Sequence, residues 1–163
     1  MKQEIVRQPE IKLIGISTRT SNAAEFNPGT AKIAATIHRY ISEAIYDKLP
    51  NRKTPSKTYC VYTEYENDHT GQYTYFIGKE VELSADIPAG LNTITVPAQV
   101  YAKFTTESGA MPNVCISGWM QIWKMTTEDL GGERNYIADF EIYDERALDP
   151  ANTVLDIFIG LKQ

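Results

Sequence analysis

The sequence predicts an α+β fold built from two similar units, each ordered strand, helix, strand, strand. Two segments carry apolar residues at the spacing of an amphipathic helix, and each is followed by two segments rich in strand-forming residues. The units cover residues 11–83 and 93–162. We therefore expect a single domain over residues 1–163, with two antiparallel sheets, one main helix on each, and a central ligand groove between the halves.

The first unit opens with a strand at 11–19 and a turn-rich segment at 21–29. An aliphatic residue then recurs at every fourth position, which predicts a helix of about five turns that begins near Pro28. These positions are Ile33, Ile37, Ile41, Ile45 and Leu49. The other expected elements are a strand at 58–66, a hairpin turn at 67–71, a strand at 72–83 and a linker at 84–92.

The second unit repeats this order, with one or two strands at 93–106 before its helix. Trp119, Ile122 and Trp123 keep helical spacing, although Gly118, which lies inside the same expected helix, costs about 1 kcal/mol there relative to alanine. Strands at 135–145 and 153–162 follow the helix. Short similar sequences occur in the same order in both units, which favours an internal duplication. They are LIGISTR (13–19) with VYAKFTT (100–106), VYTEY (61–65) with FEIYD (140–144), and YFIG (75–78) with IFIG (157–160).

Composition and charge restrict the function. The net charge is −5, from 16 basic and 21 acidic residues, whereas nucleic-acid binding draws its affinity from Lys and Arg; we expect no direct contact with nucleic acid. The N-terminus lacks the apolar segment of a signal peptide, and no apolar run reaches the ~20 residues of a membrane span, so we expect a cytoplasmic protein without membrane contact. Two histidines and the separated Cys60 and Cys115 form no metal or redox motif, so we expect no cofactor.

Alternation along the strands gathers acidic and aromatic side chains on one side. In DFEIYDER (139–146), Phe140 and Ile142 would face a core, and Glu141 and Tyr143 would point the other way. In the last strand the aliphatic residues would face a helix, and the acidic and aromatic residues would point to the opposite side of the sheet. We expect one groove lined by Tyr62, Glu64, Glu141, Tyr143, Asp156 and Phe158, with Trp119 or Trp123 from the helix side.

Such a groove favours a positively charged ligand. A carboxylate in apolar surroundings is costly unless it is paired, and aromatic faces attract cations. The alternative interpretation is that Glu141 and Glu64 are solvated strand residues, while Trp119 and Trp123 belong to the core.

Four short motifs resemble the GyrI-like domain, the effector-binding domain of AraC-type and MerR-type transcription regulators, which also occurs alone, as in the integron-cassette effector-binding proteins. The motifs are GIS (15–17), WMQIW (119–123), FEIYDER (140–146) and LDIFIGLK (155–162). The resemblance implies a duplicated α+β fold with a central aromatic pocket for a ligand that is often a lipophilic cation. Glu141 matches the glutamate of the family's FEVY pattern. Asp156 stands where family members often have the longer glutamate.

The resulting hypothesis is a stand-alone small-molecule (multidrug) binding protein for lipophilic cations, which could serve a partner regulator as its effector-binding module. Two alternatives stay open. One is a GyrI-like hydrolase that opens strained rings of genotoxic compounds, with Glu141 as general acid or base. The other is a protein that modulates DNA gyrase by direct interaction. No Ser–His or Cys–His signature is present, so we do not expect nucleophilic catalysis by a triad. Of the three hypotheses, binding is the one that we favour.

Overall fold

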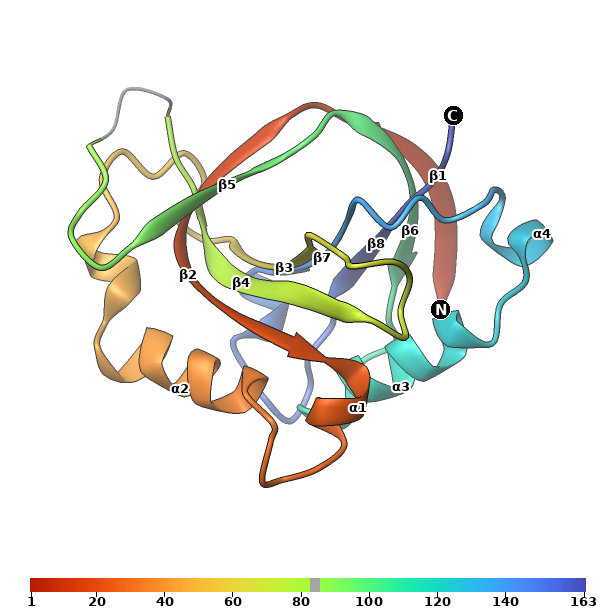
Figure 1. Ribbon diagram of the computed structural model, residues 1–163, viewed down its shortest axis with the longest axis horizontal. Coiled ribbons are helices and arrows are strands. Elements are labelled where there is room, and N and C mark those ends of the chain that lie inside the picture. Colours follow the sequence, from red (N-terminus) through yellow and green to blue (C-terminus); the bar gives the residue numbers. More distant parts are fainter. Residues whose placement is uncertain (83–85) are drawn as a thin grey trace.

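Eight antiparallel strands form one continuous sheet in the computed structural model, which describes residues 1–82 and 86–163 (Figure 1). The strands are β1 (Lys2–Gln8), β2 (Ile11–Ser21), β3 (Thr58–Thr63), β4 (Gln72–Glu80), β5 (Asn92–Val96), β6 (Gln99–Thr105), β7 (Ala138–Tyr143) and β8 (Asp156–Gly160). Their order across the sheet is β1-β6-β8-β7-β3-β4-β2-β5. The α+β class expected from the sequence is confirmed.

The arrangement differs from the expected pair of sheets, because β3 of the first unit pairs with β7 of the second. Tyr59 lies opposite Ile142, and Cys60 lies opposite Glu141. This pairing satisfies the backbone groups of two strands that would otherwise be exposed edges. Corresponding strands of the two units occupy matching places in the sheet. Counted from one edge the order is β1-β6-β8-β7, and counted from the other edge it is β5-β2-β4-β3. The duplication itself stays a prediction.

The N-terminal segment, for which no element was expected, forms β1 and pairs with β6 of the second unit. Two expected strands are shorter than their sequence patterns. Glu64 and Tyr136 have φ of 51° and 53°, a conformation that non-glycine residues rarely adopt in a strand, and they bound β3 and β7. Residue 83 of the expected strand and residues 84–85 of the expected linker lie outside the described part of the chain.

The helices are α1 (Asn22–Glu25), α2 (Ile33–Ser42), α3 (Asn113–Trp123) and α4 (Thr127–Leu130), with 3₁₀ turns η1 (Ile45–Lys48) and η2 (Glu145–Ala147). The five-turn helix expected from near Pro28 is wrong: α2 begins at Ile33, and Ala44 in a left-handed conformation separates it from η1. Glycine suits position 118 of α3, because a Cβ there would lie only 2.9 Å from Cδ1 of Ile157. This glycine lets α3 approach β8 closely.

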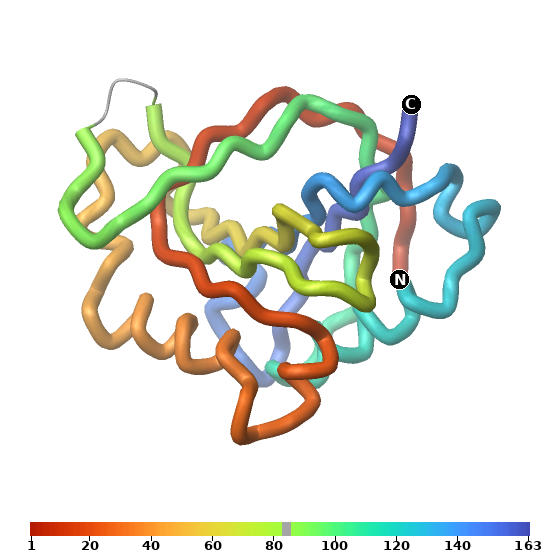
Figure 2. Tube along the Cα trace, in the orientation of Figure 1, coloured from red at the N-terminus to blue at the C-terminus, as the bar shows by residue number. Residues whose placement is uncertain are grey.

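One hydrophobic cluster takes buried residues from strands β2 to β8, and β1 packs against it through Val6, so the sheet curls around it; the trace in Figure 2 shows the curl as a ring. The cluster contains Ile11, Leu13, Tyr59, Val61, Phe76, Val96, Tyr101, Ala138, Phe140, Ile142 and Phe158, with Val6 and Ile94 packed against it. Phe140 and Ile142 thus face a core, as the alternation in β7 predicts.

The other face of the sheet carries α2 and α3, each over its own cluster (Figure 1). Tyr40 of α2 packs with residues of β2 and β4, whereas Trp119 of α3 packs with the predicted aliphatic face of the last strand. Tyr62 and Tyr143 contact both clusters. They mark a seam between the two halves, at the β3–β7 pair. Within residues 1–82 and 86–163, none of the helices has the length and apolar character that crossing a membrane requires.

Candidate functional site

Glu141 is a buried carboxylate at this seam, with 2% of its surface exposed. Its Oε2 accepts hydrogen bonds from the hydroxyl of Tyr62 at 2.7 Å and from the indole Nε1 of Trp119 at 2.6 Å. Its Oε1 accepts one from the hydroxyl of Tyr143 at 2.7 Å. The thiol of Cys115 lies 3.4 Å from Oε2. Strands β3 and β7 and helix α3 therefore converge on one carboxylate.

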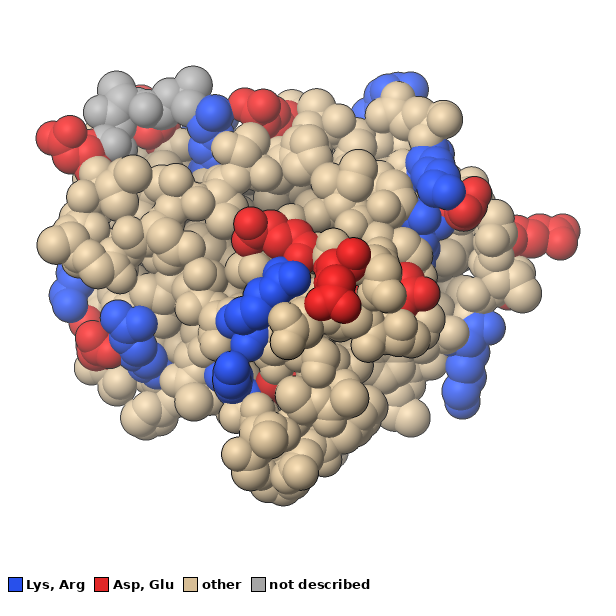
Figure 3. Space-filling model, viewed as in Figure 1, with Lys and Arg blue, Asp and Glu red and all other residues tan. Residues whose placement is uncertain are grey.

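The groups around Glu141 are neutral. Burial, reinforced by the Glu141 carboxylate itself, raises the pKa of Tyr62, Tyr143 and Cys115 well above the ordinary values, so these groups keep their protons at neutral pH. In the part of the chain that the structure describes, no ion pair within 4.0 Å involves Glu141. Among the described acidic residues, only Asp139, Glu141 and Asp156 are buried, and the acidic side chains visible in Figure 3 are interspersed with Lys and Arg.

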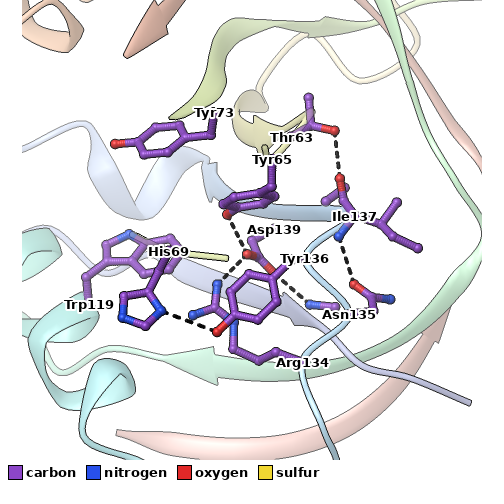
Figure 4. Close-up of polar contacts among 12 residues, drawn as sticks. Thr63, Tyr65, His69, Tyr73, Trp119, Arg134, Asn135, Tyr136, Ile137 and Asp139 are labelled. Atoms are coloured by element: carbon purple, nitrogen blue, oxygen red, sulfur yellow. Dashed lines mark hydrogen bonds and ion pairs between the residues drawn. The ribbon is translucent and has the colours of Figure 1, made fainter. Parts of the chain in front are cut away.

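Asp139, two residues earlier on the same face of β7, is also fully buried but is satisfied differently (Figure 4). Its Oδ2 lies 2.6 Å from Nη2 of Arg134 and accepts a hydrogen bond from the Tyr65 hydroxyl at 2.6 Å. The Arg134 guanidinium also lies over the ring of Tyr136, 4.4 Å from its centroid. Asp139 thus has a cation held against an aromatic ring, the kind of partner that Glu141 lacks.

Aromatic rings form the wall around Glu141. The Tyr62 ring centroid lies 5.0 Å from that of Trp119, 5.4 Å from that of Tyr75 and 5.6 Å from that of Tyr73. Such rings offer a large apolar surface together with an electron-rich face that attracts cations.

The seam is closed in this structure rather than open as a groove. Trp119 is only 8% exposed and covers Glu141 from the side of α3. The outer face of α3 is different, since Ile116, Met120 and Trp123 are exposed there. Access to Glu141 therefore requires a movement of Trp119 or of the helix that carries it.

The structure brings together four of the eight residues expected in the groove: Tyr62, Glu141, Tyr143 and Trp119. The single groove expected for all eight is wrong for Asp156 and Phe158, which lie on the opposite face of the sheet. Antiparallel pairing sets Asp156 opposite Ile142 and Phe158 opposite Phe140. Asp156 already has a cationic partner, Arg146, at 2.7 Å. The Phe158 ring stacks on Phe140 with centroids 4.5 Å apart.

The remaining two expected residues, Glu64 and Trp123, are exposed. Glu64 follows β3 with a positive φ, which takes it out of the strand alternation, and its side chain is exposed. Trp123 is 39% exposed and contacts Trp119, with ring centroids 6.4 Å apart. Among the residues that sequence reasoning missed, Cys115 is four positions before Trp119, and this spacing places both on one face of a helix. Arg134, the partner of Asp139, precedes its strand and gave no sequence signal.

A curled antiparallel sheet with two helices over a central acidic and aromatic site defines a GyrI-like effector-binding domain. The chain belongs to the Cass2 family of integron-associated effector binding proteins, whose family profile matches residues 4–161.

Two relatives are named in connection with transcription. YobU of Bacillus subtilis (strain 168), named as a candidate transcriptional regulator, is 28% identical over 152 residues, which are 93% of this chain and 92% of YobU. The transcriptional regulator BrlR of Pseudomonas aeruginosa (strain PAO1) is 29% identical over 164 residues. That match covers 99% of this chain but 56% of BrlR, so the chain spans little more than half of that regulator.

Two solved structures share the fold over nearly the whole chain. The integron cassette protein VCH_CASS2 of Vibrio cholerae has a TM-score of 0.79 and 29% identity, over 98% of this chain and 95% of that one. SAV2435, solved with bound tetraphenylphosphonium, has a TM-score of 0.78 and 19% identity, over 99% of this chain and 94% of that one.

Proposed function

We propose that this protein binds lipophilic cations, with Glu141 as the charge partner of the ligand. The observation that carries the proposal is a buried carboxylate with neutral hydrogen-bond donors and no cation within ion-pair distance in the described residues. Burying an ionised carboxylate without a counter-charge is unfavourable. A cation about 4 Å away is worth roughly 4 kcal/mol at an effective dielectric constant of 20, before desolvation.

The chemistry of the wall favours an apolar cation such as a quaternary ammonium or a phosphonium. Such an ion loses little hydration when it is buried, and each aromatic face adds roughly 0.5–2 kcal/mol. The tetraphenylphosphonium bound to the structural neighbour SAV2435 belongs to this class. Within this chain, the Arg134 guanidinium over Tyr136 beside Asp139 is a similar arrangement of carboxylate, cation and ring.

Trp119 occupies the side of Glu141 that faces α3, so a bound cation takes the place of its indole N–H. The tyrosine donors belong to central strands of the sheet and can stay in place. Trp119 belongs to a helix whose opposite face is already exposed, and its outward movement disturbs fewer buried groups. In this proposal the ligand replaces one neutral hydrogen bond of Glu141 by an ion pair.

The biological role we propose is that of an effector-binding module in transcription control. Both curated relatives described above are named as regulators or candidates. Because the chain matches little more than half of BrlR, DNA binding would come from a partner or from another part of a longer protein.

The test is a titration followed by the fluorescence of Trp119 and Trp123, with methyltriphenylphosphonium and with its neutral carbon analogue 1,1,1-triphenylethane. The two compounds have the same shape and differ in charge. Saturable binding of the cation in the micromolar range, with at least tenfold weaker binding of the neutral compound, supports the proposal. Equal affinities for the two compounds, or no response to either, would overturn it.

A further inference from the structure

Two buried tyrosine hydroxyls have no hydrogen-bond partner among the described residues: those of Tyr40 and Tyr75. Tyr75 is 1% exposed and Tyr40 is 4% exposed. An unpaired polar group in a protein interior costs about 1–3 kcal/mol, and such groups are few in native structures. A fold that keeps a tyrosine rather than a phenylalanine at such a position retains a hydroxyl that the unliganded protein does not use.

Tyr75 lies beside the Glu141 site, on the side away from Trp119. In the β3–β4 pairing it is opposite Tyr62, which donates a hydrogen bond to Glu141. Cys60, whose thiol neighbours the Tyr75 hydroxyl, is opposite Glu141 in the β3–β7 pairing. Tyr75 is therefore on β4, one strand farther from Glu141 than Tyr62 and Cys60 of β3. It belongs to the hydrophobic cluster that α2 covers.

Tyr75 is available as a donor. Burial first, and then the neighbouring Cys60 and Glu141, raise the pKa of its hydroxyl well above the ordinary value, so it keeps its proton. Tyr40 differs because its charged and titratable neighbours are Cys60, Arg52 and Tyr46, and Glu141 is not among them. Of the two unpaired hydroxyls, the one on Tyr75 is therefore the one next to the proposed cation site.

We infer that Tyr75 is a specificity-determining residue that donates a hydrogen bond to a neutral oxygen on the ligand. The inference rests on the proposed function and narrows it. The preferred ligand is a lipophilic cation that carries an ether, carbonyl or amide oxygen on its α2 side, rather than an all-hydrocarbon cation. Glu141 supplies the charge contact, and Tyr75 distinguishes among cations of equal size.

The experiment uses pairs of phosphonium ions that differ only by an oxygen in place of a methylene group. One pair is (methoxymethyl)triphenylphosphonium and propyltriphenylphosphonium, and the other is (2-methoxyethyl)triphenylphosphonium and butyltriphenylphosphonium. Dissociation constants are measured by titration calorimetry for the wild-type protein and for Tyr75→Phe, with Tyr40→Phe as the matched control. Thermal unfolding of the three unliganded proteins is measured in parallel.

We expect the wild-type protein to prefer the ether in at least one pair by about threefold or more, the size of a net hydrogen bond. Tyr75→Phe should remove this preference without weakening the hydrocarbon cations, and Tyr40→Phe should keep it. The unliganded Tyr75→Phe protein should be at least as stable as wild type, because the hydroxyl has only the Cys60 thiol beside it and no oxygen or nitrogen partner to lose; a large drop in Tm would assign it a structural role instead.

The outcomes separate the two proposals. If cations bind but both pairs show equal affinities, or if the preference persists in Tyr75→Phe, the inference about Tyr75 is wrong while the proposed function stands. If none of the four cations binds, the proposed function fails, and the inference fails with it.

Discussion

Asp139 and Glu141 lie two residues apart on the same face of β7, and of these two buried carboxylates only Asp139 has a cationic partner in the described structure. Both accept a hydrogen bond from a tyrosine hydroxyl, Tyr65 for Asp139 and Tyr62 for Glu141. The difference is Arg134. Its presence makes the Asp139 cluster self-contained, and the lack of an equivalent residue at Glu141 among the described residues is the reason for proposing an external cation there.

Asp139→Asn should destabilise the protein by about 3–5 kcal/mol, because it leaves the buried Arg134 without its counter-charge. Urea unfolding followed by circular dichroism measures the effect. The matched control is Glu43→Gln, which breaks a half-exposed pair with Arg39 and should change stability by less than about 0.5 kcal/mol. A small effect of Asp139→Asn would mean that the Arg134 pair is not the structural element described here.

Trp119→Phe should speed cation binding, because the aromatic ring remains while the hydrogen bond that competes with the ligand is lost. The unliganded variant should lose roughly 1.5–3 kcal/mol, the value of a hydrogen bond to a charged group. Stopped-flow fluorescence, with Trp123 as the remaining probe, measures the association rate. Trp123→Phe removes a ring that makes no hydrogen bond to Glu141 and should leave the rate near that of wild type. An unchanged or slower rate in Trp119→Phe contradicts a role of this side chain in closing the site.

Asp156→Asn should leave cation affinity within about twofold of wild type, because Asp156 lies on the opposite face of the sheet from Glu141. It should still lower stability, since Arg146 loses a partner 2.7 Å away. Calorimetric titration of methyltriphenylphosphonium gives the affinity. A tenfold loss of affinity would show that the ligand reaches the inner face of the sheet.

Stability should fall steeply in alkaline solution. The pKa of Tyr143 in the folded protein is raised by burial and then by Glu141, so above its ordinary value of 10.0 the unfolded chain loses a proton that the folded protein keeps. Above this pH the folded protein binds more protons than the unfolded chain, so the free energy of unfolding decreases as the pH rises. The contribution of Tyr143 to stability is fully present below pH ~9. Tyr143→Phe should reduce the slope of stability against pH by about one proton. An unchanged slope would show that Tyr143 does not titrate on unfolding in this range.

The sequence was informative within each element and less so between elements. Alternation in β7 correctly separated Phe140 and Ile142 from Glu141 and Tyr143, since it depends only on the geometry of a single strand. It could not set the register between neighbouring strands, and a shift of one residue moves a whole strand's side chains to the other face. For this reason Asp156 and Phe158 were assigned to the wrong side.

Long-range strand pairing and irregular backbone segments could not be predicted for related reasons. The pairing of β3 with β7 joins residues about 80 positions apart, and no local pattern encodes it. The left-handed conformation of Ala44 interrupts a regular apolar repeat that continues through η1. Arg134 reaches Asp139 from a segment outside any regular element, so its role depends on the tertiary structure.

The most direct test of the central claim is the affinity of Glu141→Gln for methyltriphenylphosphonium, measured by calorimetry together with the thermal stability of the unliganded variant. Glutamine keeps the shape of the side chain and removes its charge, and it replaces one of the two acceptor oxygens by an amide nitrogen. The account predicts at least tenfold weaker binding, about 1.4 kcal/mol or more, in a variant that stays folded. Unchanged affinity in a folded variant would contradict the assignment of Glu141 as the charge partner of the ligand.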